Sequence, residues 1–89
     1  MKTKEQFMMY VKLAERAEKM GIYHGERMTL LMDIESADEA FGLQLENLLN
    51  ADDENFAHDI LGIHYNINRN TFPATDFNLF VPRYAKQYA

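Results

Sequence analysis

The sequence predicts an all-α fold, a compact domain of three or four helices with an extended, aromatic C-terminal arm. Apolar residues recur at helical spacing through most of the chain, and the two prolines, Pro73 and Pro82, both lie near its C-terminal end. The 89 residues are 47 % apolar and 26 % charged, which is the composition of an ordinary folded domain. We therefore expect one helical domain over residues 1–89.

Size and cysteine content also limit the kind of protein. A chain this short buries only about 60–65 % of the surface that its unfolded form exposes, so we expect a homodimer to add stability. The lack of cysteine excludes disulfides, thiolate metal sites and cysteine nucleophiles. We see neither the apolar core of a signal peptide nor the ~20 apolar residues of a membrane span. A cytoplasmic protein without membrane contact is expected.

The first expected helix spans about residues 4–20. Thr3 and Gln6 have the spacing of a capping box, and Gly21 suits a left-handed helix end. Its core stripe at 3.6-residue spacing is Phe7, Tyr10, Val11, Ala14 and Ala17. Further apolar residues lie on its other sides, namely Met8, Met9, Leu13 and Met20. This excess predicts a second contact surface on the helix.

Residues 26–50 contain no proline and form one helix or two. One apolar stripe stays in phase throughout, because the eleven residues from Leu30 to Phe41 turn through about 1100° and leave only about 20° of drift. Ser36 and Glu39, however, have the spacing of another capping box. We favour one long helix, bent near Ser36 or Gly42, over two helices broken near residue 36.

The last expected helix covers residues 53–68. Asp53 and Glu54 complement the positive end of its dipole. Its core stripe is Phe56, Ile60, Ile63 and Ile67. His64 lies at the edge of this stripe, where we expect a hydrogen-bonded histidine at the boundary of the core.

The arm, residues 71–89, holds five of the eleven aromatic residues. Because so many rings are unfavourable in water, we expect the arm to cover the helices or a neighbouring subunit. The predicted interface residues are Phe77, Phe80, Arg83 and Tyr84, with Arg83 paired to acidic residues of the chain's centre.

Charge is unevenly distributed along the chain. Residues 1–27 and 69–89 each carry a net +2, whereas residues 28–68 contain nine acids and no Lys or Arg, which gives the total of −5. The simplest interpretation is that the basic ends pack near the acidic centre. An alternative is an acidic surface that meets a basic partner, as an inhibitor or a nucleic-acid mimic. Direct binding of nucleic acid is not expected, because few bases lie beside an acidic body.

One short motif points to chemistry. His58 and Asp59 are adjacent, and such a pair resembles the central metal ligands of the HD phosphohydrolases, with His24 and Asp76 as the remaining ligands. Four such ligands could hold a divalent cation that activates water against a phosphate ester. Against this, HD domains are generally larger than the whole chain. His58 is also predicted on the solvent face, one turn from Glu54.

The run MDIESADEAFGLQLENLLNADDENFAHDILGIHYNINRNT, closing with FVPRYA, resembles a family of small uncharacterised proteins of bacteria and their phages or prophages. The resemblance implies a cytoplasmic setting and transfers no catalytic residue. Together with the residue patterns, it predicts a non-enzymatic accessory protein that binds an unidentified protein partner. We expect no catalytic residue, no cofactor and no metal.

Overall fold

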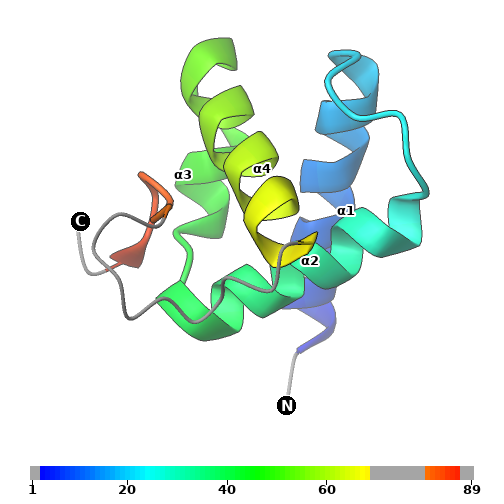
Figure 1. Cartoon of the computed structure of the whole chain (residues 1–89). Helices are drawn as coiled ribbons and strands as arrows, with labels where there is room; N and C mark the ends of the chain where they lie inside the picture. The colour runs from blue at the N-terminus through cyan, green and yellow to red at the C-terminus, as the bar shows by residue number, and fades with distance from the viewer. Residues whose placement is uncertain (1–2, 69–79, 87–89) are drawn as a thin grey trace.

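The computed structural model describes residues 3–68 and 80–86, and its helices lie around a shared apolar core (Figure 1). The helices are α1 (Lys4–Lys19), α2 (Arg27–Phe41), α3 (Leu45–Leu49) and α4 (Asp53–Asn68). The prediction of an all-α fold is confirmed. Helix α2 runs crosswise to the others (Figure 1) and contacts both α1 and α4. Helix α3 also contacts both α1 and α4.

The capping box at the start of α1 forms as predicted. The Gln6 N–H donates to Thr3 Oγ1 and the Thr3 N–H donates to Gln6 Oε1, both at 3.0 Å. The core-facing side of α1 differs in part from the predicted stripe, since Leu13 is fully buried whereas Phe7 is 48 % exposed. Phe7 instead lines a hollow together with Met28 and Met32 of α2.

The expectation of one long helix over residues 26–50 is wrong, and the alternative break near residue 36 is also wrong. Helix α2 passes through Ser36 and ends at Gly42, whose φ of +67° is left-handed. Two hydrogen bonds fix this end, because Asp38 accepts the Gly42 N–H on its carbonyl at 2.7 Å and the Leu43 N–H on its carboxylate at 2.7 Å. The carboxylate thus replaces the next helical carbonyl as the acceptor.

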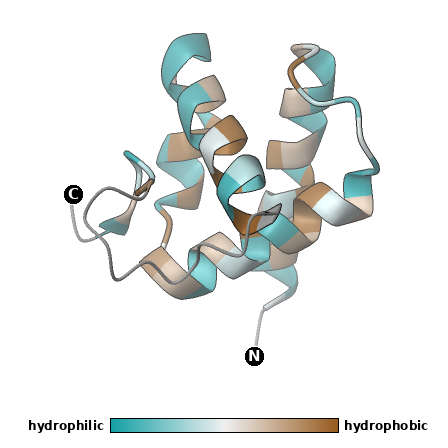
Figure 2. Ribbon diagram, viewed as in Figure 1, coloured by the Kyte–Doolittle hydropathy of each residue, from teal (hydrophilic) through white to brown (hydrophobic). Residues whose placement is uncertain are grey.

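Helix α4 has the bounds that the sequence predicts, and its buried residues are Phe56, Asp59, Ile60 and Ile63. In Figure 2, apolar and hydrophilic segments alternate along α4, as expected of a helix with one buried face. Arg16 of α1 secures the start of α4. Its guanidinium lies 4.2 Å from the centre of the Phe56 ring, donates to the Leu49 carbonyl at 2.8 Å and pairs with Asp53 at 3.0 Å.

Of the predicted arm, residues 80–86 are described, and the remainder of 71–89 lies outside the described residues. The described segment pairs with the chain just after α2. The Gln44 N–H donates to the Tyr84 carbonyl at 2.7 Å and the Lys86 N–H to the Gly42 carbonyl at 2.6 Å, so Leu43 and Ala85 face each other in an antiparallel bridge. We call residues 80–86 the C-terminal segment.

Phe80 packs against α4 where the helix has a glycine. A Cβ atom at Gly62 would overlap the Phe80 ring, so only glycine allows the ring to approach the helix this closely. Relative to alanine, Gly62 destabilises α4 by about 1 kcal/mol, but it leaves the space that the Phe80 ring of the C-terminal segment occupies.

We expect Gly62→Ala to lower the free energy of unfolding by about 1–3 kcal/mol, because the added methyl group overlaps the Phe80 ring. In a Phe80→Ala background the same change should instead stabilise the protein by up to about 1 kcal/mol, through helix propensity. Urea unfolding of the native chain, the two single variants and the double variant, followed by circular dichroism, measures both effects. Equal destabilisation by Gly62→Ala in both backgrounds would show that the Phe80 ring does not pack against Gly62.

Candidate functional site

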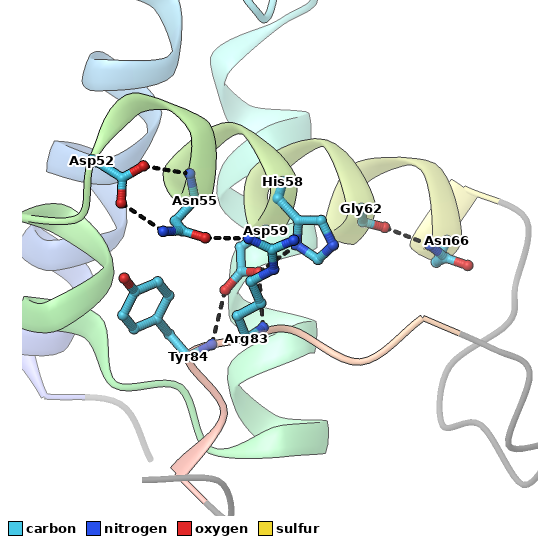
Figure 3. Close-up of polar contacts among 8 residues, drawn as sticks. All are labelled: Asp52, Asn55, His58, Asp59, Gly62, Asn66, Arg83 and Tyr84. Carbon is cyan, nitrogen blue, oxygen red and sulfur yellow. Dashed lines mark hydrogen bonds and ion pairs between the residues drawn. The ribbon is translucent and has the colours of Figure 1, made fainter.

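Asp59 is fully buried on α4, and its carboxylate holds the C-terminal segment (Figure 3). The Arg83 N–H donates to Oδ1 at 2.8 Å and the Tyr84 N–H donates to Oδ2 at 3.0 Å. His58 Nδ1 lies 3.0 Å from the same Oδ1. A buried carboxylate is stable only with such partners, so Asp59 joins α4 to a segment 24 residues later in the chain.

The structure does not bring the three described residues of the metal hypothesis, His24, His58 and Asp59, together as a group of metal ligands. His24 is exposed in the connection between α1 and α2, and Asp76 lies outside the described residues. His58 and Asp59 are adjacent, but both oxygens of Asp59 already accept backbone N–H groups. In residues 3–68 and 80–86, no three His, Asp or Glu side chains are grouped so that they could hold a metal ion.

His58 lies on the exposed side of α4, as predicted. Its position one turn from Glu54 suggests a contact with that residue, but the ring contacts Asp59 and lies 5.4 Å, centre to centre, from the ring of Phe80. Its side chain is 38 % exposed. His58 thus packs beside Phe80 and Asp59, where the C-terminal segment contacts α4.

The described interface candidates of the arm make contacts within the chain. Phe80 and Tyr84 are partly buried against the core, while Phe77 lies outside the described residues. Arg83 is exposed, and its guanidinium donates to the Asn55 side-chain carbonyl (Figure 3). Arg83 therefore reaches the acidic centre through its backbone N–H, which donates to Asp59, and not through its charge.

Asp38, a second buried aspartate, joins α2 to α1. Its carboxylate accepts the Tyr10 hydroxyl at 2.5 Å and the Leu43 N–H at 2.7 Å. Burial raises the pKa of Tyr10, and the hydrogen bond to Asp38 raises it further. The phenol consequently keeps its proton and acts as the donor.

Asp33, a third buried aspartate, joins α2 to α4. His64 Nδ1 lies 2.8 Å from its Oδ2, which confirms His64 as a hydrogen-bonded residue at the edge of the core. The Tyr23 ring meets the His64 ring edge-on at 5.1 Å. Burial raises the pKa of Asp33, and the hydrogen bond to His64 opposes that rise.

The nine acids of residues 28–68 therefore do not form one surface. Three are buried, and Asp53 pairs with Arg16. Asp52 accepts the Asn55 N–H at the start of α4, and its bonds from Asn55 lower its pKa. The four acids without such contacts in the described part of the chain are Glu35, Glu39, Glu46 and Glu54.

An exposed apolar face lies between α1 and α2. Met28 is 60 % exposed, Met32 is 59 % exposed, and Phe7 lies beside them across a hollow of about 80 Å³. The hollow is lined by Phe7, Tyr10, Met28, Leu31, Met32 and Glu35. We call Phe7, Met28 and Met32 the methionine face. Met28 and Met32 are four residues apart and off the buried stripe of α2, and this spacing is the sequence signal that could have revealed the face.

The sequence profile of a family of unknown function, DUF6874, matches residues 5–86. The chain belongs to this family. The match includes α1 except Lys4, the other three described helices and the C-terminal segment, so the contacts of Asp59 lie within the matched region. No curated protein and no solved structure matches the chain.

In the part of the chain that the structure describes, no helix has the length and apolar character needed to cross a membrane.

We expect Asp59→Asn to lower the free energy of unfolding by about 1–3 kcal/mol, because the amide cannot accept both backbone N–H groups. Asp53→Asn is the matched control on the same helix. Loss of the exposed ion pair between Asp53 and Arg16 should lower the free energy of unfolding by less than about 1 kcal/mol. Urea unfolding measures both variants, and equal small losses would contradict the role given to Asp59.

We expect Asp33→Asn to remove the part of the pH dependence of the free energy of unfolding that comes from titration of Asp33. Because the pKa of Asp33 is raised above 3.8 on folding, the folded state binds its proton more tightly, and this stability is lost as pH rises through the raised pKa. We expect the free energy of unfolding of the native chain, minus that of Asp33→Asn, to fall as pH rises above 3.8. Urea unfolding across acidic and neutral pH measures this difference, and a rise would show that the bond to His64 outweighs burial.

Proposed function

We propose that this chain is a small non-catalytic domain that acts by binding a protein. The methionine face carries the proposal, because Met28, Met32 and Phe7 expose about half or more of their area around one hollow. Clustered exposed apolar residues are characteristic of interaction sites. Methionine is common in such sites because its flexible, polarisable side chain adapts to different partners.

The contacts of the titratable groups favour binding over catalysis. Asp59 is buried with its oxygens bonded to backbone N–H groups, whereas Asp33 and Asp38 connect helices through the side chains of His64 and Tyr10. These carboxylates support the fold and do not open into a cleft where a substrate could reach them. The sequence resemblance implies an accessory role in the bacterial cytoplasm, for a protein of the bacterium itself or of its prophage.

The acidic inhibitor is the less favoured function. Nucleic-acid mimicry requires many carboxylates on one face, at a density approaching that of phosphates. Here three of the nine acids are buried and two are engaged at the start of α4. The apolar hollow is a more specific feature than the charge that remains.

We expect Met32→Ser to abolish capture of a specific protein from lysate of the cell that encodes this chain. The side chain is exposed, so stability should change by no more than about 0.5 kcal/mol. Tyr65→Ser is the matched control, because Tyr65 is 56 % exposed but does not line the hollow. Affinity purification with quantitative mass spectrometry compares the three proteins. The proposal is contradicted if both variants lose the protein that the native chain captures, or if both variants still capture it.

A further inference from the structure

Charged side chains flank the exposed methionines of α2 on both sides, and their partners differ. Arg27, which precedes Met28, pairs with Glu18 at 2.6 Å. Glu35 follows Met32 and lines the hollow of the methionine face. Within residues 3–68 and 80–86, Glu35 takes part in no ion pair. The charge of Arg27 is thus offset within the chain, whereas the charge of Glu35 is available to a partner.

Further carboxylates lie at the Glu35 end of the hollow. Tyr10 lines the hollow, and its phenol donates to the buried Asp38 carboxylate at 2.5 Å. Burial and the bond to Asp38 raise the pKa of Tyr10, and the negative charges of Glu35 and Glu39 raise it further. Both glutamates therefore lie near this hydroxyl. Glu39 is exposed and, in the described ranges, also forms no ion pair.

The hollow has the size and lining that suit one apolar side chain. Its volume is about 80 Å³, whereas pockets for small organic ligands measure about 300–1,000 Å³. Phe7, Met28, Leu31 and Met32 make most of its wall apolar. Among the described residues that line it, Glu35 alone is charged. Single apolar side chains held in small pockets are typical anchors of protein interfaces, so a protein segment fits this hollow better than a small ligand does.

We infer that the occupant of the methionine face is a basic segment of another protein. This segment places one apolar side chain in the hollow and a lysine or arginine beside Glu35 and Glu39. Opposite charges next to an apolar contact fix the register of a partner and speed its association, while an acidic segment would be repelled. The inference rests on the proposed function, because the same face does the binding, and it adds the chemistry of the partner.

A peptide library tests the chemistry of the occupant when the partner itself is unidentified. Random peptides of about 12 residues, displayed on phage, are selected on the native full-length chain, and those that also bind Met32→Ser are removed. We expect the remaining peptides to carry a net positive charge, with a lysine or arginine within about four positions of a shared apolar residue. Remaining peptides that are neutral or acidic overturn the inference.

Removal of the two charges tests the glutamates directly. Glu35→Gln with Glu39→Gln keeps the size of both side chains, and its affinity for a selected peptide should be about threefold to tenfold lower than that of the native chain. Glu46→Gln with Glu54→Gln is the matched control, because both residues are exposed and neither lines the hollow in the described part of the chain. Fluorescence anisotropy of the labelled peptide measures the affinity, and circular dichroism verifies that each variant is folded.

Salt provides a second measure of the same charges. Raising the salt concentration from about 0.1 M to about 1 M shortens the Debye length from ~10 Å to ~3 Å. The native chain should then bind the peptide about as weakly as the variant that lacks the charges of Glu35 and Glu39. Equal affinities of the native chain and this variant at low salt, or an equal loss in the control variant, overturn the inference.

Failure of this inference can be told apart from failure of the binding function. Peptides that require Met32 but not the two glutamates show that the face binds a segment of different chemistry, and the binding function stands. A dimer of the native chain in sedimentation velocity that Met32→Ser abolishes makes a second copy the occupant and overturns this inference alone. If no peptide requires Met32, a basic segment is not the occupant. Capture from lysate that also does not depend on Met32 then overturns both proposals.

Discussion

The hydrogen bonds that Asp59 accepts from the backbone of the C-terminal segment determine how the domain closes. A carboxylate with no exposed surface requires partners, and the Arg83 and Tyr84 N–H groups supply them at 2.8 and 3.0 Å. With these bonds formed, Pro82 and Ala85 are buried and complete a core that four short helices alone leave open. Position and direction of the segment are both fixed, because two adjacent N–H groups must reach the two oxygens of one carboxylate.

Buried aspartates connect different parts of the chain in three places. Asp38 joins α2 to Tyr10 of α1, and Asp33 joins α2 to His64 of α4. Within residues 3–68 and 80–86, these carboxylates bond to a phenol, imidazoles and backbone N–H groups, and to no lysine or arginine side chain. A stretch with many acids and no bases is therefore compatible with a stable core. In a domain with so little apolar surface to bury, such directional bonds select one arrangement of the helices.

Sequence patterns predicted the parts of the fold that local rules determine. Capping residues and apolar spacing predicted α1 and α4. Gly42 was predicted only as a possible bend, and the end of α2 there was missed because the apolar stripe stays in phase across it. Periodicity does not report that the Asp38 carboxylate takes the Leu43 N–H. The role of Asp59 was also beyond the sequence, because its partners are backbone groups that every residue but proline carries. The methionine face was missed because methionines at helical spacing are usually core residues.

Arg83 and Tyr84 follow α1, α2, α3 and α4 in the chain, and this order has a consequence for biosynthesis. Proteins are made from the N-terminus, so all four helices are synthesised before the residues that satisfy Asp59 exist. Until then the carboxylate is hydrated, and the side chains that the segment covers stay in contact with water. The native packing of the helices is thus reached only after the C-terminal segment has left the ribosome. Premature termination before Arg83 would yield helices without a closed core, which proteases and chaperones recognise.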